Sequence, residues 1–366
     1  MEDTNRAMDE RKGHPSASQI EALELCPGRW AASKDVPKRE EGDDAKSGTR
    51  IHAWLASDSD VTLTEEEQET ADKCKQLANE AVEKVVGKFE DADTLFREKR
   101  EWGHPYDFKP FSGKADILAI FGSRCVIVDY KTGRIPVAES AKNPQLRSLA
   151  VLACMNHAEV QEVTVIVIQP WASPRLDICE YNSENLAKAK EWLIQALRTI
   201  HDPKARRIPG LTQCKYCPVL GTCPEGGSSV TTLVERATEP GTFDGNKMKL
   251  ALDHCKTAEL VIKAVREEAK RRLTEDPESV PGWTLKSTGS VRKVTDVGQV
   301  YLRLHEEHDV APDEFTANCQ VTLKALEGML TARGFKGKRR KEELDEIIDD
   351  CISETAKAPS LVASEE

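Results

Sequence analysis

The sequence predicts an α/β protein in which helices flank a mixed central β-sheet and a mostly helical domain is appended at the C-terminal end. Up to about residue 230, apolar runs rich in β-branched residues alternate with amphipathic helical segments, in the order helices, three strands, helix, strand, helix. Beyond that point charged helical segments dominate, with a candidate strand only at residues 283–286.

The chain divides into four expected segments. Residues 1–13 and 355–366 show no helical or strand periodicity, and we expect both ends to be disordered. Residues 14–230 should form the α/β domain and residues 231–354 the mostly helical one. The boundary near residue 230 follows the Gly/Ser-rich stretch 224–230, which we expect to be flexible.

The composition indicates a soluble cytoplasmic protein. No stretch approaches the roughly 20 apolar residues of a membrane span, and the polar start of the chain is unlike a signal peptide. The net charge of −11 argues against a generally basic nucleic-acid coat but says nothing of a local groove. In a reducing compartment, clusters among the eleven cysteines suggest metal binding rather than disulfides.

Local signals give the order of the elements. Thr64 and Glu67 form a capping box at the start of a long helix. The charged segment 34–46 is expected to be a loop. The helix that starts at Gly48 carries His52 on an apolar stripe. We expect helices at 14–25, 48–56, 64–89, 143–155, 183–200 and about 246–273, and strands at 94–102, 113–121, 125–131 and 162–170.

Charged residues are concentrated on the β-hairpin that the strands at 113–121 and 125–131 should form. Asp116 lies in the first strand, and Asp129 and Lys131 end the second, where residues two apart point to one face. The alternative interpretation is a hairpin on the protein surface whose charged residues have no role in catalysis or metal binding. Because the preceding apolar run indicates burial, and buried charges need partners, we favour a magnesium-dependent phosphodiester hydrolase.

In this hypothesis each residue of the hairpin has a role. Asp116 and Asp129 would bind Mg²⁺ or Mn²⁺, which prefer oxygen ligands, and the peptide carbonyl of Tyr130 could be a further ligand. Lys131 would hold the attacking water or stabilise the phosphate in the transition state.

Further polar residues have two interpretations each. His52 is either a packed core histidine or a ligand whose nitrogen favours Mn²⁺. Glu98 could add a carboxylate from the preceding strand, and the pattern does not exclude Glu101 instead. Gln145, at a helix start after Asn-Pro, could contact the catalytic lysine or the DNA backbone, or only cap the helix.

A compact group of cysteines, Cys214, Cys217 and Cys223, has the spacing C-x2-C-x5-C. A four-ligand site needs one more thiolate, for which Cys26 in a Cys-Pro-Gly turn is the best candidate. Zinc sites often use two C-x2-C pairs, whereas a trio with one distant cysteine suits an iron–sulfur cluster better. The spacing alone therefore favours a cluster modestly and leaves zinc open.

Taken together and in order, these motifs resemble the RecB-like nucleases of the PD-(D/E)xK superfamily. The resemblance is to their iron–sulfur branch, which includes the CRISPR-associated adaptation exonuclease, and in particular to phage-encoded members. It rests on Cys26, Gly-Thr-x-x-His52, Glu98, Gly-Lys-Ala-Asp116, Asp129-Tyr-Lys131, Gln145, Cys214, Cys217 and Cys223.

The resemblance implies a restriction-endonuclease-like core and a metal-dependent DNA exonuclease acting on single strands or duplex ends. It implies that Asp116, Asp129, Lys131, Gln145 and Glu98 are catalytic and that the four cysteines hold a 4Fe–4S cluster. It further suggests phage DNA recombination or replication in the cytoplasm of a bacterial host, with a single-strand-binding protein as a candidate partner.

One position departs from the family pattern. Leu149 stands where Gln-x-x-x-Tyr is usual, which puts substrate handling in doubt rather than metal binding. The main alternative is a non-catalytic DNA-binding or partner-docking protein that keeps a structural cluster or zinc. The joint presence of Asp116, Asp129 and Lys131 argues against it.

Overall fold

The computed structural model describes residues 11, 13–34, 36, 42–57, 61–237, 245–285, 297–317, 319, 322–335 and 337–348. The chain divides into two compact units, residues 1–285 and 286–366. The C-terminal tail predicted to be disordered, and all but residues 11 and 13 of the N-terminal one, lie outside the described residues.

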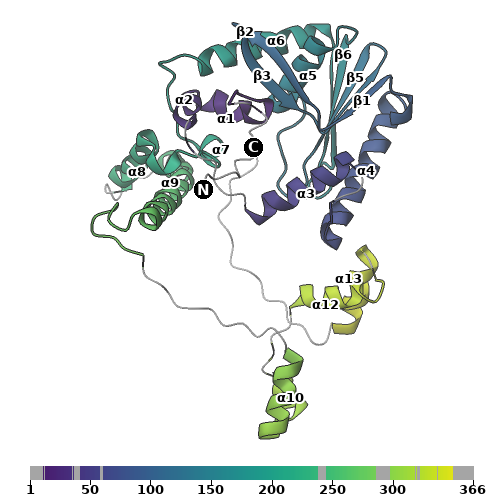
Figure 1. Cartoon of the computed structure of the whole chain (residues 1–366), viewed down its shortest axis with the longest axis vertical. Helices are drawn as coiled ribbons and strands as arrows, with labels where there is room; N and C mark the ends of the chain where they lie inside the picture. The colour runs from purple at the N-terminus through teal and green to yellow at the C-terminus, as the bar shows by residue number, and fades with distance from the viewer. Residues whose placement is uncertain are drawn as a thin grey trace, which may run out of the picture. The chain divides into compact units, whose positions relative to one another are not determined.

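A five-stranded mixed sheet organises the first unit, as predicted (Figure 1). Only the pair β5–β6 is parallel; the other neighbours are antiparallel. The strand β7 was not predicted. In sheet order, the strands are β1 (Thr94–Arg97), β4 (Ile117–Phe121), β5 (Arg124–Tyr130), β6 (Glu162–Ile168) and β7 (Leu176–Tyr181).

Helices cover both faces of this sheet. One apolar core lies between the sheet and α1 (Ile20–Leu25), α5 (Pro144–Asn156) and α6 (Ser183–Ile200). A second core lies between the sheet and α3 (Asp43–Ser57) and α4 (Glu65–Val85). The capping box of α4 forms as expected, whereas α3 begins within the segment predicted to be a loop.

The alternation of side chains along β5 decides which face its last residues take. Cys125 and Ile127 lie in the core on the α5 side, and Val126 and Val128 lie in the core on the α4 side. Because successive side chains of a strand point to opposite faces, Asp129 belongs to the α5 side of the sheet.

The predicted strands 94–102 and 113–121 are each interrupted where the chain leaves the main sheet. Beyond the interruptions, β2 (Arg100–Tyr106) and β3 (Lys109–Lys114) form a separate two-stranded sheet. Glu98, with φ 51°, and Asp116 stand at the two breaks, and the Glu98 N–H donates to the Asp116 carbonyl at 3.0 Å. The prediction that Asp116 is part of a strand was therefore wrong.

Short helical elements complete the first unit. The stretch 224–230, predicted to be a flexible exit, lies within a helix, and the expected boundary near residue 230 falls inside the same helix. No strand forms at the described residues Trp283–Leu285. The elements are α2 (Gly28–Ser33), α7 (Leu211–Cys214), α8 (Pro224–Ala237), α9 (Gly245–Glu275), and the 3-10 turns η1 (Ala17–Gln19), η2 (Phe89–Asp91) and η3 (Leu220–Thr222).

The long helix α9 belongs to the same unit as the sheet because it packs on the cysteine segment. Val261 and Ala264 of α9 form a small apolar core with Cys214, Cys217 and Leu220. A Cβ at Gly221 would lie 2.6 Å from the Ala264 carbonyl oxygen, so the close approach of η3 to α9 requires glycine. The division at residue 285 follows from this packing.

The second unit is helical in its described part. Its elements are α10 (Val297–His308), α11 (Pro312–Ala317), α12 (Leu323–Thr331) and α13 (Gly337–Ile348). Within it, Arg340 pairs with Glu327 at 3.1 Å and donates to Thr331. Across the described parts of both units, no helix combines the length and apolar character needed to span a bilayer.

Candidate active site

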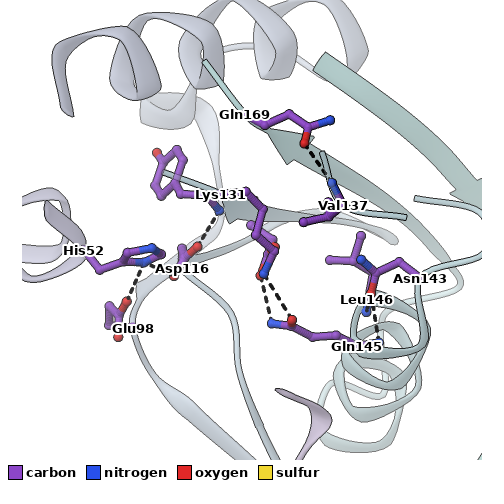
Figure 2. Close-up of polar contacts among 11 residues, drawn as sticks. His52, Glu98, Asp116, Lys131, Val137, Asn143, Gln145, Leu146 and Gln169 are labelled. Carbon is purple, nitrogen blue, oxygen red and sulfur yellow. Dashed lines mark hydrogen bonds and ion pairs between the residues drawn. The ribbon is translucent and has the colours of Figure 1, made fainter. Parts of the chain in front are cut away.

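Three ligand-type side chains converge where α3 meets the breaks in the strands (Figure 2). His52 Nδ1 lies 2.8 Å from Asp116 Oδ1 and 3.5 Å from Glu98 Oε1. One ligand atom from each of the three residues lies within 4.8 Å of the others. Two carboxylates and an imidazole at this spacing suit a divalent cation such as Mg²⁺ or Mn²⁺.

Local structure fixes each member of this group. Ile51 and Leu55 anchor α3 in the core beneath the sheet, which leaves His52 at the edge of the core. The second carboxylate oxygen of Asp116 accepts the Tyr130 N–H at 2.5 Å. Glu98 is held at its break by an ion pair with Lys114.

Burial and mutual contacts shift the protonation of the group. Burial disfavours the charged imidazolium of His52, but hydrogen bonds to Asp116 and Glu98 outweigh it and raise its pKa to about 10. Burial raises the pKa of Asp116 to about 6, against the opposing effect of His52. Burial also opposes ionisation of Glu98, yet contacts with His52 and Lys114 lower its pKa to about 2.

Asp129, Lys131 and Gln145 form a second group, joined by one ion pair and two hydrogen bonds. Lys131, directly after β5, has its Nζ 2.7 Å from Asp129 Oδ2, as expected from their two-residue spacing. Gln145 bridges the pair, because its Nε2 donates to Asp129 Oδ1 at 2.9 Å and its Oε1 accepts from Lys131 Nζ at 3.1 Å. Burial disfavours the charged lysine, but the charge of Asp129 outweighs this effect and raises the pKa of Lys131.

The start of α5 places Gln145 in this position. The Asn143 side chain accepts the backbone N–H groups of Gln145 and Leu146, and Pro144 occupies the first helical position. Gln145 therefore faces Asp129, which points to the α5 side of the sheet. Among the three interpretations of Gln145 from the sequence, the structure brings it to the lysine.

His52 and Asp116 of the first group and all three residues of the second group line one cavity of about 350 Å³. Asp129 contributes to this cavity but is held by Lys131 and Gln145, whereas Glu98 takes the place beside His52 and Asp116. The Tyr130 side chain is buried in the α4-side core. The cavity is lined by His52, Lys114, Asp116, Asp129, Tyr130, Lys131, Thr132, Gly133, Ile135, Val137 and Gln145.

The structure shows which of two glutamates lies beside His52 and Asp116, a choice that the sequence left open: it is Glu98 and not Glu101. Glu101 is buried elsewhere, with Asn156 donating to one carboxylate oxygen and Lys99 3.2 Å from the other. Lys114 was missed as a residue of the site. Its place directly before Ala-Asp116 could have indicated it, since a lysine at the end of one strand can reach a carboxylate on the paired strand.

The four cysteines Cys26, Cys214, Cys217 and Cys223 gather on the side of the molecule where α1 and α2 meet α7. The first three are buried and Cys223 is partly buried, and all are free thiols. Burial raises the pKa of the Cys214 thiol, and the nearby thiols of Cys217, Cys26 and Cys223 raise it further, against a hydrogen bond from Gly210 that lowers it.

Backbone N–H groups point at two of these sulfurs. The Ile208 N–H donates to Cys26 Sγ at 3.2 Å, and the Gly210 N–H donates to Cys214 Sγ at 3.4 Å. Gly28 holds the N-terminal segment against residues 205–208, because its N–H donates to the Arg206 carbonyl at 2.9 Å. Donors aimed at sulfur suit thiolates, and this arrangement fits the ligands of a metal cluster.

Comparison with protein families gives one match. Residues 16–366 match the family described as "Protein of unknown function (DUF2800)". The chain belongs to this family. A search of curated proteins finds no match.

Among the solved structures with a distant likeness to this family member are two whose names refer to exonucleases. One, from Eubacterium rectale and titled as a candidate exonuclease, is 11% identical, with a TM-score of 0.35 over 57% of this chain and 90% of that one. The other, an alkaline exonuclease from Laribacter hongkongensis, is 8% identical, with a TM-score of 0.25 over 52% of this chain and 91% of that one. At these TM-scores the likeness supports no argument about function.

Proposed function

We propose that this protein is a Mg²⁺- or Mn²⁺-dependent deoxyribonuclease that hydrolyses phosphodiester bonds from DNA ends. The observation that carries the proposal is the pairing of a half-buried lysine with Asp129 and Gln145 in the cavity that His52 and Asp116 also line. A cation-binding group beside a positioned lysine can place a divalent cation and an ammonium group next to a scissile phosphodiester.

His52, Glu98 and Asp116 would hold the cation, with Asp129 available to it from across the cavity. When bound, a divalent cation lowers the pKa of water and neutralises charge on the scissile phosphate. Lys131 keeps its proton, because the charge of Asp129 favours the ammonium. Its ammonium can therefore orient the attacking water or stabilise the extra negative charge of the pentavalent phosphate.

Gln145 positions this lysine. It contacts both Lys131 and Asp129, so neither side chain can rotate away without losing a hydrogen bond. Such preorganisation matters for the rate, since a displacement of about 1 Å in a reacting group costs on the order of a hundredfold.

In the same proposal, the four cysteines bind a 4Fe–4S cluster that joins the N-terminal helices to the segment after α6. Cys214, Cys217 and Cys223 with the distant Cys26 lack the two C-x2-C pairs that zinc sites often use. This spacing and the resemblance of the motifs to the iron–sulfur branch favour the cluster over zinc.

The substrate and the biological role are proposed from the resemblance of the motifs. The substrate would be single-stranded DNA or duplex ends, and the protein would act in phage recombination or replication in the bacterial cytoplasm. A single-strand-binding protein would be a candidate partner.

The test is digestion of end-labelled single- and double-stranded DNA by anaerobically prepared protein with Mg²⁺ or Mn²⁺. Asp129→Ala and Lys131→Ala should each abolish digestion with the fold retained, and Lys188→Ala, an exposed lysine on α6, should not. Labels at either end reveal the polarity. Absence of metal-dependent digestion by the wild type would exclude the nuclease and leave a non-catalytic DNA-binding or partner-docking protein.

A separate measurement tests the metal at the cysteines. A cluster predicts brown protein with iron, inorganic sulfide and absorbance near roughly 400 nm. Zinc predicts colourless protein with about one zinc per chain. Stoichiometric zinc without iron in anaerobic protein would overturn the cluster.

A further inference from the structure

A large cavity opens beside the catalytic lysine, and the cysteine segment forms one of its walls. The cavity has a volume of about 1430 Å³, above the roughly 300–1,000 Å³ of small-molecule sites. Lys131 and Gln145 line it, so it is continuous with the proposed reaction centre. Lys215 and Tyr216 line it from the turn between Cys214 and Cys217.

Tyr216 combines a fixed backbone with an uncovered ring. Its side chain is 75% exposed, although Cys214 and Cys217 on either side of the turn are buried. Arg29 of α2 donates to the Tyr216 carbonyl at 2.8 Å and to the Gln213 carbonyl at 2.6 Å. The turn is therefore anchored from both ends while the ring is free to meet a ligand.

The surroundings of the ring favour a phosphodiester strand over an apolar partner. Lys215 is exposed and its Nζ lies 5.3 Å from the centre of the Tyr216 ring. Glu66 and Glu67 at the cavity are paired with Arg134 and Arg50. In all, five carboxylates and six cationic side chains line the cavity: Glu21, Asp43, Asp44, Glu66 and Glu67, with Arg11, Arg29, Arg50, Lys131, Arg134 and Lys215. An aromatic ring beside an exposed lysine matches the alternation of base and phosphate in a single strand.

We propose that Tyr216 stacks on a base of a nucleic-acid strand that runs through this cavity to Lys131, with Lys215 contacting the adjacent phosphate. The cysteine site thereby holds a substrate-binding wall of the nuclease. The proposal rests on the nuclease function and adds to it a binding residue outside the reaction centre.

The experiment measures binding and digestion of a fluorescent 20-nucleotide thymidine strand by the full-length protein. Binding is measured in the Asp129→Ala background, so that the strand stays intact. Tyr216→Ala should weaken binding roughly 5- to 150-fold, the range of one lost base stack, and Tyr216→Phe should bind like the parent. In the active protein, Tyr216→Ala should raise KM and leave kcat nearly unchanged.

Two controls separate stacking from a structural effect. Trp283→Ala removes another aromatic ring that is 74% exposed and should bind like the parent. A strand with abasic positions should bind the parent more weakly than the thymidine strand, whereas Tyr216→Ala should bind both alike. Iron content and absorbance near roughly 400 nm should be the same in all variants.

The failures of the two proposals are distinguishable. Unchanged binding and KM in Tyr216→Ala, in a wild type that digests DNA, would overturn the stacking role alone. Equal binding of the abasic and thymidine strands by the parent would do the same. A wild type that neither digests nor binds a strand would overturn both proposals.

Discussion

His52 Nδ1 and Asp116 Oδ1 lie 2.8 Å apart, so a single proton links the imidazole and the carboxylate. Glu98 Oε1 lies 3.5 Å from the same nitrogen. The imidazolium therefore supplies, between two carboxylates, the positive charge that a cation would bring. Binding of the cation at Nδ1 requires displacement of this proton.

Metal affinity should consequently rise with pH. His52 keeps its proton up to a pKa of about 10, and Asp116 becomes protonated below a pKa of about 6. Between these values, binding at Nδ1 releases one proton, and affinity for Mn²⁺ should rise about tenfold per pH unit. Below pH about 6 the dependence should steepen, since Asp116 must also lose a proton. Calorimetric titrations in two buffers of different ionisation enthalpy count the protons. An affinity for Mn²⁺ that does not change between pH 6 and pH 9 would contradict this exchange.

The nitrogen ligand should also influence the choice of metal. His52→Ala should weaken the activation by Mn²⁺ roughly tenfold or more and that by Mg²⁺ less, because imidazole suits transition metals better than Mg²⁺. The measurement is the metal concentration for half-maximal digestion. Equal losses with both ions would indicate that His52 is only a packed partner of Asp116.

Gln145→Ala should lower kcat about a hundredfold with little change in KM, because Lys131 and Asp129 lose their common partner. Single-turnover digestion measures the effect. Gln195→Ala, an exposed glutamine on α6, is the matched control and should leave the rate unchanged. A similar KM increase instead of a kcat loss would assign Gln145 to DNA binding.

Leu149→Tyr should destabilise the protein by roughly 1–3 kcal/mol, the usual cost of overpacking. Leu149 is 3% exposed, and a Cβ at Gly113 would lie 2.5 Å from its Cδ2 atom, so the site has no room for a larger ring. Urea unfolding gives the free energy, and Leu149→Met should cost less. A tyrosine variant as stable as the wild type, with stronger DNA binding, would show that the family tyrosine fits here.

Gly28→Ala should lower the iron content and the thermal stability together. A Cβ at Gly28 would lie 2.6 Å from the Ala205 carbonyl oxygen, so the turn that carries Cys26 would have to move. Gly227→Ala, in α8 with no atom within 4 Å of its added Cβ, is the control. It should be neutral or stabilise the helix. Full iron content in Gly28→Ala would show that this contact does not influence metal binding by the cysteines.

Much of the architecture was predictable because local signals suffice for it. The continuous apolar runs of β5 and β6, the capping box at Thr64 and the Asn-Pro start of α5 each act within a few residues. The proximity of Asp129 and Lys131 followed from the two-residue period of a strand. The helical character of 224–230 was missed because Gly and Ser weaken the helix pattern, while packing of η3 and α8 on α9 was invisible in the sequence.

The sequence by itself determined which residues carry charge and sulfur, and that Asp129 and Lys131 face one site. Only the tertiary structure decided between Glu98 and Glu101 and brought His52 to Asp116. It also placed Gln145 between Lys131 and Asp129 and put Tyr216 on the wall of the large cavity. These relationships depend on where two strands leave the main sheet and on how separate helices pack. Contacts between elements far apart in the chain set both, and a local pattern does not encode them.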